Sequence, residues 1–160
     1  MTGSFSCGQP SLDAWLRDMA LYNHHQQFTR TFVIADGDFN VVGYHSLCAA
    51  MIHRDDVSRS IKGGKAPMDI PVALLARLAV DQGHQGLGLG AALMRNALQS
   101  AVAASRTVAF RAVMVDAIDE TAASFYRKFG FLPTRISPTK LLLPMKTVLA
   151  SLEEAADPKG

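Results

Sequence analysis

The most constraining feature of this sequence is a continuous passage from a buried strand, through a glycine-rich turn, into a helix. Residues 70–80 are almost entirely apolar, which is typical of a central strand covered on both faces. Glycines follow at positions 83, 86, 88 and 90, and apolar residues then recur at helical spacing as far as Ala104. This order predicts an α/β domain in which the turn brings the start of a helix close to a ligand.

The predicted turn is suited to an anionic ligand. Glycine allows backbone conformations closed to other residues, and the first amides of a helix are unpaired and lie at the positive end of its dipole. Both properties favour a pyrophosphate. A Walker loop is excluded, since Gly-Lys-Ser/Thr is absent. Gly86, Gly88 and Ala91 satisfy the dinucleotide-binding pattern G-x-G-x-x-A, but Ser105 and Arg106 stand where an acidic residue would bind the ribose.

Hydrophobic periodicity outside this passage predicts a mixed α/β (α+β) fold. Helices are predicted at residues 11–24, 89–104 and 119–128, and strands at residues 31–35, 41–50, 70–80, 108–115, 131–135 and 140–146. The Asp-Gly turn at residues 36–38 favours an antiparallel hairpin. Residues 53–68 have no apolar period, so we expect a loop with at most a short helix. Pro144 predicts an edge or a bulge in the last strand.

Composition places these elements in one globular domain. The chain has 160 residues, of which 49% are hydrophobic and 19% charged, so we expect residues 1–160 to form a single domain and residues 151–160 a flexible tail. The sequence has neither an apolar run long enough for a membrane span nor a signal peptide, so a cytoplasmic location without membrane association is expected. Cys7 and Cys48 are expected to be reduced.

Basic residues are concentrated in two segments. The first contains Arg54, Arg59, Lys62 and Lys65, and the second contains Arg127, Lys128, Arg135, Lys140 and Lys146. The second lies in an interval, between Glu120 and Glu153, that has no other acidic residue. Two alternatives remain open: a surface that binds a polyanion, and scattered charge that keeps the protein soluble.

Two motifs resemble those of the GNAT superfamily of acyl-CoA-dependent N-acyltransferases. Residues 85–90, Gln-Gly-Leu-Gly-Leu-Gly, match the Q/R-x-x-G-x-G/A turn of that family. Residues 124–131, Ser-Phe-Tyr-Arg-Lys-Phe-Gly-Phe, are similar to its FYxKxGF helix and strand. The resemblance implies a twisted, largely antiparallel sheet that is splayed near residues 78–116 and flanked by helices.

The resemblance also implies that acetyl-CoA is the co-substrate. Pantetheine would pair with the backbone of the strand before the turn, and the turn would surround the pyrophosphate. The residues assigned to this site by the resemblance are Leu78, Ala79, Val80, Gln85, Gly86, Leu87, Gly88, Leu89, Gly90, Ala91, Phe125 and Tyr126.

Further segments are similar to the acetyltransferase toxins of type II toxin–antitoxin modules. They are Cys-Gly at 7–8, Leu-Asp-Ala-Trp-Leu at 12–16, Thr-Arg-Thr-Phe-Val at 29–33, Val-Gly-Tyr at 42–44 and Leu-Ala-Arg-Leu-Ala-Val-Asp at 75–81. The likeness covers residues 5–146, although relatives usually have a strand ahead of Cys-Gly. It implies a homodimeric toxin that acetylates the α-amine of aminoacyl-tRNA, blocks translation and is bound by a ribbon-helix-helix DNA-binding antitoxin. The alternatives are acetylation of a small amine or a protein lysine, and a module that binds without catalysis.

Acyl transfer from a thioester to an amine requires a neutral amine, stabilisation of an oxyanion and a proton for the departing thiolate. Backbone amides at residues 78–80 are candidates for the oxyanion. Tyr126 is the candidate catalytic acid, because a phenol with a pKa of about 10 is protonated at neutral pH, and the family tyrosine at this position has that role. The alternative for Tyr126, which lies between Phe125 and Phe129, is a core position.

No general base is evident in the sequence. The α-amine of an esterified amino acid is a weaker base than a lysine amine, so much of it is neutral without help. The five histidines lack the spacing of metal ligands, so no metal is expected.

Overall fold

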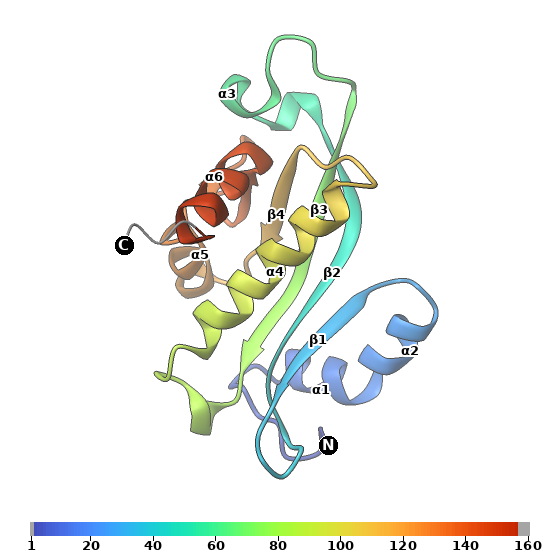
Figure 1. The fold of residues 1–160 in the computed structure, drawn as a ribbon, viewed down its shortest axis with the longest axis vertical. Coiled ribbons are helices and arrows are strands. Elements are labelled where there is room, and N and C mark those ends of the chain that lie inside the picture. The colour runs from blue at the N-terminus through green and yellow to red at the C-terminus, as the bar shows by residue number, and fades with distance from the viewer. Residues whose placement is uncertain (1, 157–160) are drawn as a thin grey trace. The chain divides into compact units, whose positions relative to one another are not determined.

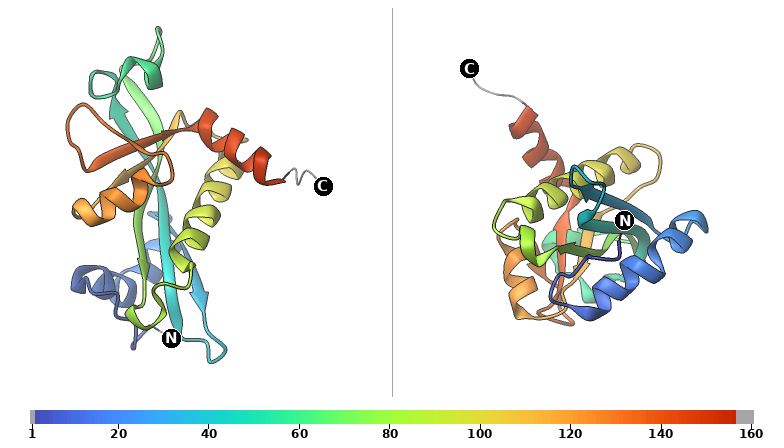
Figure 2. Two further views of the ribbon diagram at one scale, coloured as in Figure 1. Left: turned by 90° about the vertical axis from the view of Figure 1, so that its left-hand side faces the viewer. Right: turned by 90° about the horizontal axis from the view of Figure 1, so that it is seen from below.

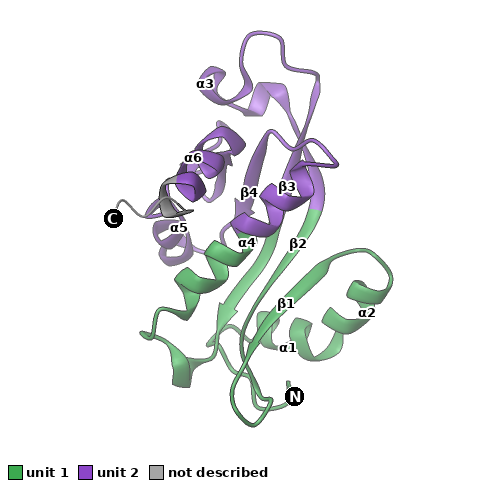
Figure 3. Ribbon diagram, viewed as in Figure 1, with its two compact units in different colours: residues 1–48, 75–97 green, residues 49–74, 98–160 purple. Residues whose placement is uncertain are grey.

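The computed structural model describes residues 2–156 as two compact units (Figures 1 and 3). Unit 1 comprises residues 1–48 and 75–97, and unit 2 comprises residues 49–74 and 98–160. The helices are α1 (Pro10–Asp18), α2 (Ala20–His25), η1 (Arg54–Asp56), α3 (Arg59–Lys62), η2 (Gln82–His84), α4 (Leu89–Ser105), α5 (Glu120–Arg127) and α6 (Met145–Ala156). The strands are β1 (Arg30–Ala35), β2 (Val41–His53), β3 (Asp69–Val80), β4 (Ala112–Asp116), β5 (Leu132–Pro133) and β6 (Lys140–Pro144).

The six strands form one sheet in the order β1-β2-β3-β4-β6-β5. Within unit 1, β1 and β2 form the predicted antiparallel hairpin, with Arg30 opposite Leu47. Within unit 2, β6 pairs antiparallel with both β4 and β5. It runs directly into α6 (Figure 2). The mixed α/β fold with a largely antiparallel sheet is therefore confirmed. No helix among residues 2–156 is both long and apolar enough to span a bilayer.

The core of unit 1 is built around Tyr44 of β2. The ring is fully buried, with Phe5 edge-on at 5.6 Å and Trp15 stacked at 6.0 Å between centroids. The Tyr44 hydroxyl donates a hydrogen bond of 2.8 Å to the carbonyl oxygen of Leu12. These contacts fix α1 against β2, because the Tyr44 ring packs on aromatic neighbours and its hydroxyl has a hydrogen-bond acceptor within the core.

The single helix predicted at residues 11–24 is divided into α1 and α2 at Met19, so that prediction is wrong in its interior. Met19 lies outside helical geometry, with φ −122° and ψ −27°. The break leaves the long Met19 side chain 43% exposed and buries the small Ala20, which is 6% exposed. The helix is therefore broken at the point where the small Ala20 packs into the core, although the apolar spacing of the sequence continues through Met19.

His45 of β2 gives unit 1 a polar group with 0% exposure. Its Nε2 lies 2.7 Å from Oδ1 of Asn96, and the ring stacks on Phe32 at 4.8 Å. An acceptor at that distance holds the proton on Nε2, and Nδ1 has no partner among the described residues. Burial lowers the pKa of His45, against the opposing effect of the Asn96 hydrogen bond. Protonation at Nδ1 would leave a buried charge without an acceptor.

We expect the free energy of unfolding to fall on acidification because of His45. The unfolded chain takes up this proton near a pKa of about 6.5, above the folded pKa, so stability is complete above that pH and is lost as pH falls through it. The slope for one such group is at most about 1.4 kcal/mol per pH unit. Urea unfolding from pH 7.5 to 5 should show a smaller pH slope for His45→Gln than for the exposed control His25→Gln. Equal slopes would contradict the assignment.

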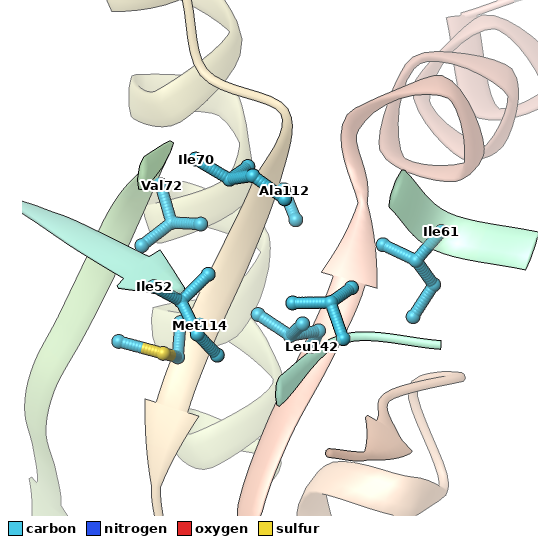
Figure 4. Close-up of a cluster of buried hydrophobic side chains, with 8 residues drawn as sticks. Ile52, Ile61, Ile70, Val72, Ala112, Met114 and Leu142 are labelled. Atoms are coloured by element: carbon cyan, nitrogen blue, oxygen red, sulfur yellow. The ribbon is translucent and has the colours of Figure 1, made fainter. Parts of the chain in front are cut away.

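The core of unit 2 joins the sheet to the segment between β2 and β3. Its buried members are Ile52, Val57, Ile61, Ile70, Val72, Ala112, Met114 and Leu142 (Figure 4). Ile61 of α3 is 4% exposed and lies in this cluster with side chains from β2, β3, β4 and β6. The expected loop with a short helix at residues 53–68 is confirmed as η1 and α3. Because Ile61 is buried, this segment is held against the core.

The C-terminal part differs most from the sequence-based expectation. The strand expected from residue 108 begins at Ala112. The strand β6 lies between β4 and β5, so it is not an edge strand, and Pro144 is tolerated because it is the last residue of β6. Helix α6 begins directly afterwards at Met145, and Met145 and Val148 bury one helical face. Part of the expected tail, residues 151–156, is therefore helical, and residues 157–160 lie outside the described residues.

Candidate active site

The end of β3 is tied to the N-terminal segment by Asp81. Its carboxylate accepts hydrogen bonds from the Ser6 amide at 3.0 Å, the Gly83 amide at 3.0 Å and Nδ1 of His84 at 3.1 Å. The bond from the Ser6 amide, followed by those from His84 and Gly83, holds the pKa of the Asp81 carboxyl below its usual range. Asp81 therefore stays ionised and fixes the start of the turn from both sides.

Gln85 closes the same turn with its side chain. Its Nε2 donates to the carbonyl oxygen of Val80 at 3.0 Å and to that of Cys7 at 3.3 Å. The side chain of this predicted cofactor residue is thus used to hold the turn against β3. The contact between residues 6–8 and the turn was not predicted from the sequence. The glycine of the Cys-Gly pair was a signal for a close approach of two segments. Gly8 has φ +94°, and a Cβ at this position would lie 2.9 Å from Nε2 of Gln82.

The centre of the turn has the backbone geometry that its glycines predict. Gly86 and Gly88 both have φ +81°, a conformation that L side chains rarely adopt, and a Cβ built at either position would meet open space. Leu87 between them is 69% exposed. The turn is therefore an open cradle of backbone atoms on the side to which a Cβ of residue 86 or 88 would point.

Helix α4 begins directly after the cradle. Its first hydrogen bond, from the Ala92 amide to the Gly88 carbonyl, is 3.1 Å long. The amides of Leu89, Gly90 and Ala91 therefore belong to the first turn, where amides lack intrahelical partners and the dipole is positive. Unpaired amides beside an open cradle form an anion-binding arrangement.

The strand β3 reaches this turn with alternating burial. Ala79 is buried in the core of unit 1, and Leu78 and Val80 are half-buried on the opposite face. Arg77, immediately before them, places its guanidinium 4.0 Å from the centroid of Trp15. Burial lowers the pKa of Arg77, and the cation is held by the aromatic face of Trp15. Ten predicted cofactor residues thus lie on one strand, turn and helix of unit 1.

Tyr126 and Phe125 belong to α5 of unit 2. The helix is N-capped by Asp119, whose Oδ1 accepts a hydrogen bond of 2.9 Å from the Ala122 amide. Tyr126 is 7% exposed and packs edge-on against Phe125 at 5.4 Å and Phe131 at 5.8 Å. Burial raises the pKa of Tyr126 to about 12. The ring is a core residue of unit 2, and the phenol stays protonated at neutral pH.

The described side chains give no sign of a metal site. Among the side chains described within residues 2–153, no three His, Cys, Asp or Glu side chains gather in a way that would hold an ion. Cys7 and Cys48 are free thiols. Burial, followed by a hydrogen bond with Asp13, raises the pKa of the Cys7 thiol to about 11, so it is a poor nucleophile at neutral pH.

Comparison with known proteins connects this architecture to one enzyme family. Residues 28–133 match the family described as Acetyltransferase (GNAT) domain. The chain is 40% identical over 147 residues to a tRNA-acetylating toxin of Mycobacterium tuberculosis (strain ATCC 25618 / H37Rv), covering 92% of this chain and 87% of the relative.

Solved structures give the same result. The structure of AtaT complexed with acetyl-methionyl-tRNAfMet has a TM-score of 0.87 and 28% identity, covering 95% of this chain and 92% of AtaT. A mutant AtaT toxin bound to the C-terminus of the antitoxin AtaR and acetyl-CoA has a TM-score of 0.80 and 26% identity, covering 96% of this chain and 90% of that one.

Proposed function

The chain belongs to the GNAT acetyltransferase family, and we propose that it transfers the acetyl group of acetyl-CoA to the α-amine of aminoacyl-tRNA. This reaction would block translation and make the chain a toxin. The observation that carries the proposal is 40% identity, over 92% of the chain, with a tRNA-acetylating toxin. The two basic segments agree with it, because an RNA acceptor requires cations for its phosphates.

The turn of unit 1 fits the diphosphate of acetyl-CoA. The cradle leaves open space beside Gly86 and Gly88, and the amides at the start of α4 supply donors for an anion. The backbone of residues 78–80 would align the pantetheine arm, and its amides are the candidates for stabilising negative charge on the carbonyl oxygen. Acetyl-CoA supplies the activated thioester, and the protein supplies position and hydrogen bonds.

Tyr126 is the proposed catalytic acid. With a pKa of about 12, its phenol carries a proton on Oη throughout the neutral range and can donate it to the departing sulfur. Exclusion of water raises the pKa of this phenol and would also raise the pKa of a thiol whose sulfur leaves beside it, so the two groups remain matched for proton exchange. The proton released by the acylated amine then restores the phenol.

Further partners follow from the same relatives. We include in the proposal a ribbon-helix-helix DNA-binding antitoxin that covers the active site, a homodimeric assembly and a cytoplasmic location. The AtaT toxin solved with the C-terminus of its antitoxin supports an antitoxin as a partner.

Transfer of radiolabelled acetyl from acetyl-CoA tests the acceptor. The purified chain should label bulk charged tRNA, and mild alkaline deacylation should release the label as N-acetyl amino acid. Deacylated tRNA, spermidine and a lysine peptide are the matched alternatives, and they should remain unlabelled. Label on spermidine or the lysine peptide alone would instead identify a small-amine or protein acetyltransferase and contradict the tRNA proposal.

A further inference from the structure

Unit 2 contains a basic pocket formed between α3, the start of β3 and the segment before β4. Its volume is about 380 Å³. Three cations line it, Lys62, Lys65 and Arg111, and its apolar surface includes Pro67, Pro71 and Phe110. In the sequence the two lysines are only members of a basic segment, and no pattern connects them with residues more than 40 positions later.

The pocket is fixed by hydrogen bonds that leave its cations at the surface. Nε of Arg111 donates to the carbonyl oxygen of Ile61 at 2.8 Å, and the Arg111 amide donates to that of Pro71 at 2.8 Å. Arg54 fixes the segment before β3, since its amide donates to the carbonyl oxygen of Met68 at 2.9 Å and its guanidinium to that of Ala66 at 3.4 Å. Ile61, whose carbonyl oxygen accepts the Arg111 bond, belongs to the unit 2 core (Figure 4). The pocket is therefore preformed.

The electrostatics of the pocket favour an anion with an apolar part. No acidic residue is among the described residues that line it. No carboxylate in the described part of the chain lies within ion-pair distance of Lys62, Lys65 or Arg111. A planar guanidinium and two mobile ammonium groups suit phosphate oxygens. Phe110 and the two prolines provide surfaces on which a base or ribose can pack.

We infer that this pocket binds one nucleotide of the RNA acceptor, with its phosphate on Lys62, Lys65 and Arg111 and its base against Phe110. The inference rests on the proposed function. A volume of about 380 Å³ is in the range of a site for one small ligand such as a nucleotide. Arg54 supplies a further cation beside the pocket, because its guanidinium donates to the carbonyl oxygen of Ala66, which lines it.

The double variant Lys62→Ala/Lys65→Ala tests the phosphate contacts. Its affinity for deacylated bulk tRNA, measured by fluorescence anisotropy at 0.15 M salt, should fall by about 10- to 30-fold, and the slope of log affinity against log salt should fall by about 2. Arg95→Ala/Arg106→Ala removes the same charge from exposed positions outside both basic segments and is the matched control. Equal affinity and slope in the two double variants would overturn the inference.

The base contact is tested by Phe110→Ala and Phe110→Tyr. Loss of stacking should lower tRNA affinity at least about fivefold for alanine, and tyrosine should restore it. No effect of alanine would overturn the base contact. Binding of 5′-AMP by calorimetry separates a free nucleotide from RNA: loss of AMP binding in the lysine variant with unchanged tRNA affinity would overturn the RNA assignment.

These measurements distinguish failure of the pocket inference from failure of the proposed tRNA acetylation. The pocket inference survives if the lysine variant loses tRNA affinity but charged tRNA is not acetylated by the wild-type chain. Conversely, acetylation of charged tRNA with equal KM in both double variants overturns the pocket inference alone.

Discussion

Replacement of Tyr126 by phenylalanine is expected to lower kcat for acetyl transfer by about 10²- to 10⁴-fold, the contribution of a positioned general acid. The reason is that only the Oη proton is lost, while the ring contacts with Phe125 and Phe131 remain. Acetyl-CoA affinity, measured by calorimetry, should stay within about twofold of the wild type, because a proton donor to a leaving group acts after binding. The free energy of unfolding should change little.

Two other tyrosines provide the controls for this variant. Tyr44→Phe removes the hydroxyl that bonds to the Leu12 carbonyl, so it should cost about 1 kcal/mol of unfolding free energy and leave kcat nearly unchanged. Tyr22→Phe changes an exposed residue and should alter neither quantity. If Tyr126→Phe keeps full turnover, or loses activity only in proportion to acetyl-CoA affinity, Tyr126 is a core residue and not the acid.

The fold could be predicted from the sequence where one periodicity was long and undisturbed. The apolar run that became β3 and the helical spacing of α4 are such cases, and both elements lie where they were expected. The prediction of secondary structure failed where tertiary packing interrupts a helix whose apolar spacing is continuous in the sequence. Met19 has the spacing of a core residue but is turned outward at a break, and no local signal distinguishes it from Leu16.

The last helix was missed for a different reason. Residues 140–146 are apolar enough for a strand, and the apolar positions that follow, Met145, Val148 and Leu152, were not recognised as the first residues of a helical repeat. The helical period begins at the residue directly after Pro144. A proline at the end of a strand is a boundary, and treating it as an interior residue extended the strand too far.

The candidate site could be predicted only as far as its contacts are local in sequence. The cradle at residues 85–90 is one continuous turn, so the order of its residues was sufficient. The ties made by Asp81 and Gln85 reach Ser6 and Cys7, more than 70 positions away, and a pattern within one segment contains no information about such pairs. The same limit applies to Arg111, which completes the basic pocket of unit 2.

Substitution of Gly88 by valine is expected to weaken acetyl-CoA binding by about 100-fold, equivalent to about 2.7 kcal/mol. Two effects contribute. A β-branched residue at φ +81° is strained, and its side chain would occupy the open space above the cradle in which we place the diphosphate. Calorimetry with acetyl-CoA measures the loss, and circular dichroism verifies that the variant is folded.

Gly88→Ala and Gly37→Val separate the two effects. Alanine imposes the left-handed strain of roughly 1 kcal/mol without bulk, so its affinity should lie between those of the wild type and valine. Gly37 also faces open space but has no positive φ and lies in the β1–β2 turn, so valine there should leave acetyl-CoA affinity unchanged. Wild-type affinity in a folded Gly88→Val protein would mean that the diphosphate is bound elsewhere, because no ligand can share the volume of that side chain.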